Sequence, residues 1–534
     1  MFLLLVAALI LTYALYQYTI ARRLPPGPLP FLILGNLPQL FWYATKKGGF
    51  VRAMQEFQQH HGDVYTLWIG PMYFVNICTY EKAKDLMITQ GHTQVGRFLA
   101  PFALLAEMDD TGKIWGIGSS VGETWTEHRR FALQTLRNFG MGKNLMEQRI
   151  IQEFDHHLTN TENNMKSGKV EVNSLDFVNM LIGNLINRLL FGYRFETDES
   201  RDHFFRVKNG INEMADSATP LDYLIWHWWK YVPLLSRRYT STMEAIEPVL
   251  KLVQDNVDRR IREIASGDYT LHDEPGDYID AYLLEQRRRG GDVGEMTTHG
   301  LVIDLFDLWQ AGQDTTSTTI QWGLFLFMKN LAAMKRCQDE ILRVTSQNRN
   351  LSLTDRASTT YFTAACTEIQ RHASILAFNL WRRTTGPSKI AGYDIPIGTL
   401  TTAQLSVILD DPKVFEQTEK FSPERYLGEN GKELTEKTIP FGIGKRSCPG
   451  EGMAKAEIYL ILGNLLNRYN LTPSPTLPPT GPTSGLSVFH RPADFGVVLE
   501  KIDGHCCQAM DGDYIAHCQS EKCPADRREI FMVN

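Results

Sequence analysis

A single cysteine in a glycine-rich loop is the feature that most restricts what this chain can fold into. Cys448 lies in the run Phe441-Gly-Ile-Gly-Lys-Arg-Ser-Cys-Pro-Gly450, and an amphipathic helix is predicted after it, from Glu451 to Tyr469. Pro449 suits the first position of a helix, where a missing N–H group needs no partner. Free N–H groups and the helix dipole favour a thiolate there, so the loop is typical of a single anionic sulfur ligand for a metal centre.

Cys448 has two alternative roles. Most lone cysteines in turns are buried structural residues. A structural zinc site is the second alternative, but such sites normally use ligands paired as C-x-x-C. The next cysteine in the sequence, Cys506, lies far beyond that spacing.

The size and composition of the chain indicate one large catalytic unit. Its 534 residues, 43% of them hydrophobic, can bury a large core, and neither an internal repeat nor a long linker divides them. A net charge of −6 gives no support for nucleic-acid binding. Scattered cysteines in the body, rather than a disulfide framework, fit a reducing compartment; they are Cys78, Cys337, Cys366 and Cys448.

The first residues predict a membrane anchor. Residues 1–21 are almost continuously apolar, and about 20 such residues span a bilayer core. Arg22 and Arg23 follow, then Pro25-Pro-Gly-Pro28, so residues 22–30 form a basic, proline-rich hinge. Positive charge after the apolar run predicts a single-pass anchor with a cytosolic body. A cleaved signal peptide is the alternative, although a basic start and a clear cleavage site are lacking.

Hydrophobic patterning predicts a mainly α-helical body with a minor β-sheet region. Alternating apolar residues indicate short strands within residues 50–90 and 385–408, whereas residues 125–345 are mainly helical in pattern. The longest helical pattern covers residues 297–331. In its middle stands Ala311-Gly-Gln-Asp-Thr-Thr316, where glycine and adjacent threonines are poor helix formers.

This broken helix pattern indicates a functional site. Gly312 leaves room for another group against the backbone, and Thr315 can bond a carbonyl one turn back. Asp314 places an acid beside that alcohol, and an acid and a hydroxyl together can deliver protons. The alternative is a threonine-rich helix face in the core.

Three further motifs contain charged residues, and in two of them aromatic residues stand nearby. Glu368-Ile-Gln-Arg371 places an acid and a base on one helix face. Phe421-Ser-Pro-Glu-Arg-Tyr426 follows it, and Trp125-Thr-Glu-His-Arg129 precedes both. Together with the cysteine loop, whose fixed positions read F-x-x-G-x-R-x-C-x-G, these motifs resemble those of the cytochromes P-450 in order and spacing. The chain is most similar to the microsomal, family-2-like group over residues 1 to about 500.

The resemblance implies the cytochrome P-450 fold for a catalytic domain over residues 31–500, preceded by an N-terminal transmembrane helix. It implies haem b, iron protoporphyrin IX, with the Cys448 thiolate as axial iron ligand. Asp314 would supply protons, and Thr315 would bond on the oxygen side. A structural triad of Glu368, Arg371 and Arg425 is implied. The remaining cofactor-binding residues implied are Arg446, Trp125, Arg129, Arg97, Arg382 and Phe441.

The implied activity is mono-oxygenation of a lipophilic small molecule: a xenobiotic, fatty acid or steroid. Electrons would come from NADPH-cytochrome P-450 reductase, with cytochrome b5 as a further candidate partner, at the endoplasmic reticulum membrane. A haem-thiolate isomerase or dehydratase that needs no reductase is the alternative. A non-catalytic haem or lipophile carrier is a second rival.

Ala377 and Trp381 stand where the group usually has prolines, so the substrate is not implied. Residues 501–534 have no counterpart and are expected to be a polar tail; a metal site there is the alternative.

Overall fold

The computed structural model describes residues 1–99, 106–139, 144–216, 227–478 and 487–502. The predicted tail therefore lies almost wholly outside the described residues.

Helices make up most of the described chain, as the sequence predicts. The longer ones, of eleven residues or more, are α1 Phe2–Ala21, α2 Leu37–Lys47, α3 Phe50–His61, α6 Gly122–Asn138, α7 Asn144–Glu162, α8 Ser174–Phe191, α9 Asp198–Asp216, α10 Pro233–Ser266, α11 Tyr278–Arg288, α12 Thr298–Lys329, α13 Leu331–Thr345, α14 Thr360–Ala373 and α17 Glu451–Arg468. Shorter α-helices are α4 Tyr80–Lys84, α15 Leu405–Leu409 and α16 Gly431–Lys437. Single turns of other helix types are η1 Asp85–Thr89, η2 Gly91–Thr93, η4 His227–Tyr231, η5 Leu353–Ala357 and η6 Pro423–Tyr426.

The strands form three small sheets. A five-stranded sheet has the order β1-β2-β8-β5-β3, with bounds Val64–Ile69, Met72–Ile77, Leu400–Ala403, Arg382–Arg383 and Gly96–Arg97. Its β2 and β8 pair in parallel, and the other neighbours are antiparallel. A three-stranded sheet has the order β4-β10-β9, with bounds Lys169–Asn173, Gly496–Lys501 and Tyr469–Pro473. A hairpin joins β6, Ser388–Ile390, to β7, Tyr393–Ile395.

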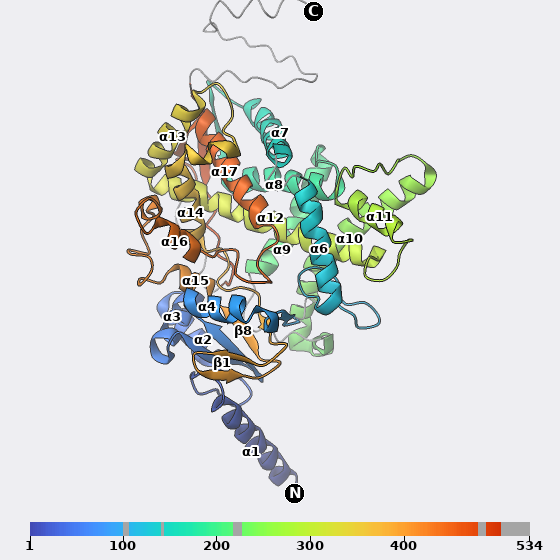
Figure 1. The fold of residues 1–534 in the computed structure, drawn as a ribbon, viewed down its shortest axis with the longest axis vertical. Coiled ribbons are helices and arrows are strands. Elements are labelled where there is room, and N and C mark those ends of the chain that lie inside the picture. The colour runs from blue at the N-terminus through green and yellow to red at the C-terminus, as the bar shows by residue number, and fades with distance from the viewer. Residues whose placement is uncertain (100–105, 140–143, 217–226, 479–486, 503–534) are drawn as a thin grey trace, which may run out of the picture.

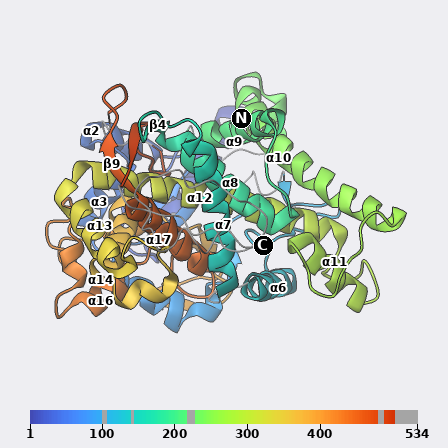
Figure 2. The ribbon, with the colours of Figure 1, turned by 90° about the horizontal axis from the view of Figure 1, so that it is seen from above.

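Helix α12 runs through the centre of the helical part, where α8, α10, α14 and α17 pack around it (Figures 1 and 2). Its start is fixed by Thr297, whose hydroxyl accepts a hydrogen bond from the Gly300 N–H group. Most of its side chains are buried on every side, as expected for a helix in the core of a large protein. The close contact with α17 depends on Gly323, because a Cβ atom there would lie 2.6 Å from Leu462.

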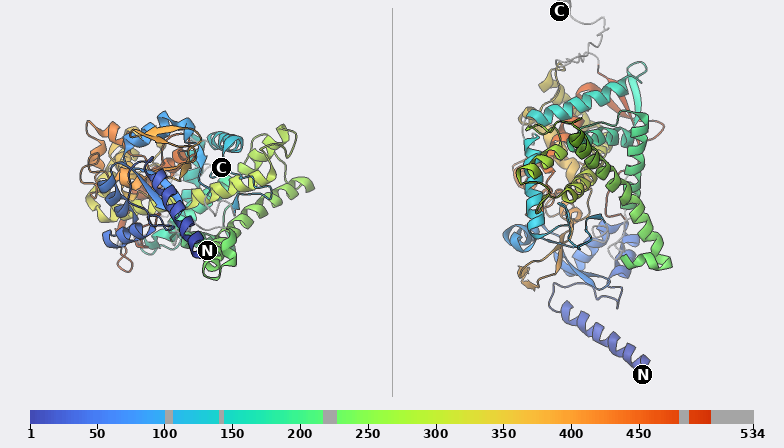
Figure 3. Two further views of the ribbon diagram at one scale, coloured as in Figure 1. Left: turned by 90° about the horizontal axis from the view of Figure 1, so that it is seen from below. Right: turned by 90° about the vertical axis from the view of Figure 1, so that its right-hand side faces the viewer.

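The N-terminal helix α1 extends away from the body at the end that carries the five-stranded sheet (Figures 1 and 3). Many of its apolar side chains are exposed, including Phe2, Leu4, Leu5 and Leu11. Across the described ranges, however, no helix meets both the length and the apolarity needed to span a bilayer. The transmembrane character predicted for residues 1–21 is therefore not confirmed.

Candidate active site

The cysteine loop is held tightly between α17 and η1. Helix α17 begins at Glu451, and the Cys448 N–H group donates to the Phe441 carbonyl at 3.0 Å, closing the loop. Gly442 and Gly444 have positive φ angles of 71° and 81°. A Cβ atom on Gly444 would lie 2.0 Å from the Met87 carbonyl oxygen, so only glycine fits there.

The Cys448 thiol keeps accessible surface although protein surrounds it in most directions. Burial raises the pKa of the Cys448 thiol, and hydrogen bonds from the Gly450 and Glu451 N–H groups lower it less than burial raises it. The net direction is upward. The sequence pattern correctly predicted N–H donors for a thiolate but not the larger effect of burial. A bound cation would therefore supply the missing stabilisation of the thiolate.

Four arginines from four segments converge beside this loop. They are Arg97 on β3, Arg129 on α6, Arg382 on β5 and Arg446 in the loop itself. Burial, followed by the charges of the other arginines, lowers the pKa of Arg97 to about 10, of Arg382 to about 9 and of Arg446 to about 8. These mutual effects show that the guanidinium groups lie close enough to repel one another.

Backbone carbonyls hold the arginines in place. Arg446 donates to Val95 at 2.9 Å and to Ser120 at 2.6 Å, and its guanidinium lies 3.9 Å from the centre of the Trp125 ring. Arg129 donates to the Ser447 carbonyl at 2.7 Å, which joins α6 to the cysteine loop. The cation–π and carbonyl contacts orient the guanidinium groups but leave their charges unneutralised.

The arrangement fits a group with carboxylates. Within the described ranges, none of the four arginines forms a salt bridge. Buried donors also lack acceptors there: Nε and Nη1 of Arg382 and the indole Nε1 of Trp125. Such orphaned donors are rare in native proteins and indicate an absent acceptor. Two propionates beside a thiolate-ligated iron match this set of donors, so the residues present fit haem.

The middle of α12 presents one accessible face. Ala311 is exposed and Thr315 half-exposed, although the following turns are buried. The Thr315 hydroxyl donates to the Ala311 carbonyl at 2.8 Å, as its position in the sequence predicts. Gly312 does allow another group to lie against the backbone, and that group is the side chain of Ile186 on α8. A Cβ atom added at Gly312 would lie 2.8 Å from Ile186.

Asp314 is engaged by two cations that the sequence did not reveal. Its Oδ2 accepts a hydrogen bond from Arg491 at 2.5 Å, and its Oδ1 lies 3.6 Å from the Lys208 ammonium. Burial lowers the pKa of Lys208 to about 8, and the Asp314 charge opposes that shift. No motif surrounds either cation, and only tertiary structure brings α9 and the segment before β10 to α12.

The triad residues meet in the core. Glu368 is fully buried and accepts two hydrogen bonds from Arg371, at 2.8 and 2.9 Å. Arg425 donates to both Glu368 oxygens at 3.1 Å, and the Ser422 N–H group donates at the same distance. Arg371 also donates to the carbonyls of Leu409 and Thr418. The network ties α14 to η6 and to the chain that precedes the cysteine loop.

Phe441 lies at the start of the loop, where its ring packs 5.5 Å from the Lys455 ammonium. The structure thus groups Cys448, Phe441, Trp125 and the four arginines together. Asp314 and Thr315 share α12, and the triad lies elsewhere as a separate buried network.

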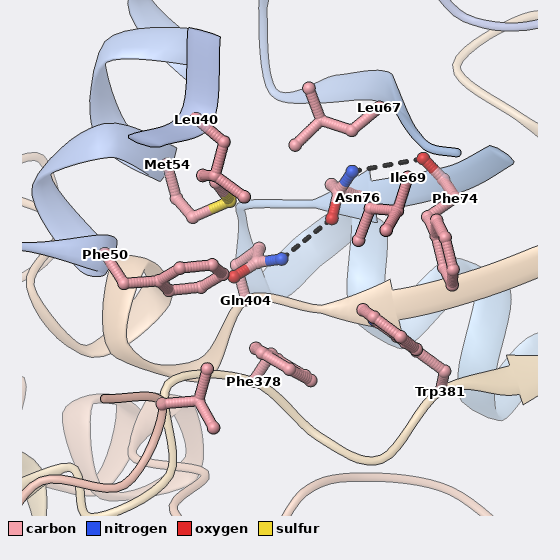
Figure 4. A pocket seen from close by; sticks show the side chains of 11 residues that line it. Leu40, Phe50, Met54, Leu67, Ile69, Phe74, Asn76, Phe378, Trp381 and Gln404 are labelled. Carbon is pink, nitrogen blue, oxygen red and sulfur yellow. Dashed lines mark hydrogen bonds between the residues drawn. The ribbon is translucent and has the colours of Figure 1, made fainter. Parts of the chain in front are cut away.

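A small aromatic pocket lies between α2, α3 and the five-stranded sheet (Figure 4). Trp381 packs 4.0 Å from Phe74 and stacks on Phe378 at 5.3 Å between ring centroids. On the polar edge of this pocket, Gln404 donates a hydrogen bond to Asn76 at 2.8 Å. Trp381 therefore fills the position where a proline was expected, and it makes this part of the chain bulky and apolar.

Comparisons with known proteins agree with this geometry. The family described as cytochrome P-450 matches residues 25–496. The probable cytochrome P-450 cyp-35D1 of Caenorhabditis elegans is 34% identical, over 88% of this chain and 92% of the relative. Cytochrome P-450 2H1 of Gallus gallus is 32% identical over the same shares, and cytochrome P-450 2B19 of Mus musculus is 31% identical over 85% and 88%. The chain belongs to the cytochrome P-450 family: it is a mono-oxygenase that uses haem with an axial cysteine thiolate, and it resembles the family-2 proteins 2H1 and 2B19.

Proposed function

We propose that this mono-oxygenase inserts one oxygen atom into a lipophilic small molecule, with electrons from an NADPH-dependent reductase. The observation that carries the proposal is the convergence of four unneutralised arginines on the Cys448 loop. When bound, haem supplies the activation of molecular oxygen. Cys448 would ligate its iron, and Arg97, Arg129, Arg382 and Arg446 would bind its carboxylates.

The accessible face of α12 supports a proton-delivery role. Thr315 holds its hydroxyl on that face by bonding the Ala311 carbonyl. Asp314, one residue earlier, would pass protons toward this hydroxyl. Arg491 and Lys208 would fix the direction of the Asp314 carboxylate by contacting its two oxygens. Asp314→Asn should reduce turnover by about 10²-fold or more while leaving the absorbance of bound haem unchanged.

The aromatic side chains around Trp381 support a lipophilic substrate. Phe74, Phe378 and Trp381 pack together as buried apolar side chains around a small pocket, and ligand pockets for lipophilic molecules are lined by such residues. This chemistry favours apolar molecules, the class to which xenobiotics, fatty acids and steroids belong.

The electron donor would dock on the outer face of α6. Arg130 and Arg137 line a surface hollow there with Trp125 and Arg129, which would face the cofactor. Exposed positive charge beside a cofactor attracts an acidic partner. NADPH-cytochrome P-450 reductase is the proposed donor, with cytochrome b5 as a second candidate. Charge reversal at Arg130 and Arg137 should slow reduction without altering the ferric spectrum.

We propose attachment to the endoplasmic reticulum membrane through residues 1–21. The exposed apolar side chains of α1 and the basic pair Arg22 and Arg23 support this, since apolar surface and adjacent positive charge bind lipid. Deletion of residues 1–21 should move the enzyme from the membrane to the soluble fraction, and a variant that still sediments with membranes would contradict the proposal.

The first test is the spectrum of dithionite-reduced protein under carbon monoxide. Wild type should show the strongly red-shifted band of a thiolate-ligated haem, Cys448→Ala should lose it, and Cys366→Ala, which removes a buried cysteine elsewhere, should keep it. The same band in Cys448→Ala would refute the ligand assignment. Substrate conversion without NADPH and reductase would instead favour the isomerase or dehydratase alternative.

A further inference from the structure

A fully buried histidine connects the cofactor-binding face of α6 to the core helix α12. His128 and Asp304 both have no exposed surface. Their side chains meet at 2.8 Å between His128 Nδ1 and Asp304 Oδ1. The other ring nitrogen, Nε2, lies 2.8 Å from the Glu295 carbonyl oxygen. His128 occupies a variable position of the W-x-x-x-R motif, directly before Arg129.

The two acceptors determine the protonation of this pair. A carbonyl oxygen only accepts, so Nε2 of His128 must carry a hydrogen. Asp304 faces Nδ1 with its Oδ1 and accepts a hydrogen bond from the Tyr278 hydroxyl with its Oδ2 at 3.1 Å. Both oxygens of Asp304 are thus placed as acceptors, so a hydrogen on Nδ1 completes the contact. Burial alone would lower the pKa of His128, but Asp304 and the Glu295 carbonyl outweigh it, and the net direction is upward.

The surrounding residues enclose the His128 side chain closely. A Cβ atom on Gly300 would lie 2.8 Å from His128 Cε1 and 3.0 Å from the Tyr282 hydroxyl. Trp115 packs edge-on against the imidazole at 6.0 Å between ring centroids. The ring is thus enclosed by α11, α12 and the segment before α6, and it fixes the turn of α6 that carries Trp125 and Arg129.

We propose that the His128–Asp304 ion pair positions two cofactor-binding residues: it holds α6 against α12 so that Trp125 and Arg129 reach the haem carboxylates. When the imidazolium loses its proton, this contact between the two helices weakens. Deprotonation removes one of the two hydrogens that His128 donates, and a nitrogen lone pair then faces an oxygen of Asp304 or Glu295. Neither outcome is favourable in a buried site. Haem is therefore held less firmly as the pH rises. The inference depends on the haem site but on no particular substrate or electron donor.

Other ionisable groups face this pair and set the controls. They are Asp307 on α12, Tyr278 and Tyr282 on α11, and Glu295, which forms a salt bridge with Lys113 at 2.9 Å; His299 of α12 packs against Trp115, the neighbour of the imidazole. Burial raises the pKa of Asp307 to about 7, so Asp307 also titrates in the relevant range. A pH effect that survives removal of His128 belongs to another group such as Asp307, which is present in every variant.

The experiment measures the rate of haem transfer from the holoenzyme to a haem-scavenging apo-globin between about pH 6 and pH 9. Wild type should release haem slowly at the low end and faster as the pH rises. His128→Leu and Asp304→Asn should each release it about tenfold faster at the low end, with the difference closing at the high end. Turnover is not part of the readout.

His157→Leu is the matched control. His157 is an enclosed histidine on α7 whose ring packs 4.6 Å from Phe177, and burial lowers its pKa to about 4, so it is neutral throughout the measured range. This variant should keep the wild-type pH profile. A flat wild-type profile, or one that runs parallel in His128→Leu and wild type, would overturn the proposal. Should His128→Leu not fold, a wild-type profile in Asp304→Asn would be equally decisive.

Discussion

Substitution of Gly444 by alanine should push the cysteine loop away from Met87 of η1, against which the loop packs. Gly444 has a φ angle of 81°, and its added Cβ atom would lie 2.0 Å from the Met87 carbonyl oxygen. Neither group can move without a shift of the main chain, because the Cβ position is set by the Gly444 backbone and the oxygen belongs to the Met87 backbone. The loop must therefore move, and Cys448, four residues further on, moves with it.

Two contributions give the expected loss of stability. The left-handed backbone conformation costs an alanine about 1–2 kcal/mol. Forcing a methyl group into a filled site costs about 1–3 kcal/mol more. Gly444→Ala should therefore lower the free energy of unfolding by about 2–5 kcal/mol. Gly392 separates the two contributions, because its φ angle is 86° but a Cβ atom there meets nothing within 4 Å.

The assay compares Gly444→Ala with Gly392→Ala by urea unfolding and by the reduced carbon monoxide spectrum. Gly392→Ala should lose about 1–2 kcal/mol and keep the red-shifted band. Gly444→Ala should lose more stability and also the band, since its loop no longer presents the sulfur correctly. Equal losses of stability, with the band retained in both, would refute the inference that the contact with Met87 fixes the loop.

Two other substitutions test the buried carboxylates. Glu368→Ala should lower the free energy of unfolding in urea by about 3–5 kcal/mol, because it leaves two arginines without their shared partner; the exposed Glu416→Ala should change it by less than about 0.5 kcal/mol. Burial raises the pKa of Glu457 to about 8, so the folded protein retains a proton that the unfolded chain releases, and stability should fall as the pH rises from about 4.5 to 8. Keeping Glu457 buried lowers the free energy of unfolding by about 3 kcal/mol at pH 7 relative to acidic pH, and Glu457→Gln should remove this pH dependence. Identical slopes of the urea midpoint against pH in wild type and Glu457→Gln would contradict this prediction.

The sequence predicted those features that depend on local pattern. The helix expected over residues 297–331 corresponds to α12, and the strands expected within 50–90 and 385–408 correspond to β1, β2 and the pieces from β6 to β8. Each rests on periodicity or on turn residues, which act within a few positions. Parallel pairing of β2 with β8 was beyond such reasoning, because it joins segments more than 300 residues apart through a crossover that leaves no local signal.

The candidate site divides in the same way. Arg446 and Phe441 were predictable because they belong to one loop with Cys448. Lys208 and Arg491 were not, because each is an isolated charge whose meaning depends on the neighbour it reaches. His128 was not predictable for another reason. It occupies a variable position of the W-x-x-x-R motif, and a motif gives no information about the residues at its variable positions. The direction of the Cys448 pKa was missed for a related reason, since burial is a property of the whole fold.

The two halves of the site are each unfavourable alone and complementary to one cofactor. Burial and mutual repulsion lower the pKa values of Arg97, Arg382 and Arg446, so keeping them charged costs free energy. Burial raises the pKa of Cys448, so its thiolate is disfavoured as well. An anionic group offsets the first penalty and a metal cation the second, and haem carries both on one rigid ring. Haem bound by these residues would therefore relieve two destabilising features of the folded protein at once. Since anything that binds only the folded state stabilises it, the cofactor is expected to form part of the fold as well as of the chemistry.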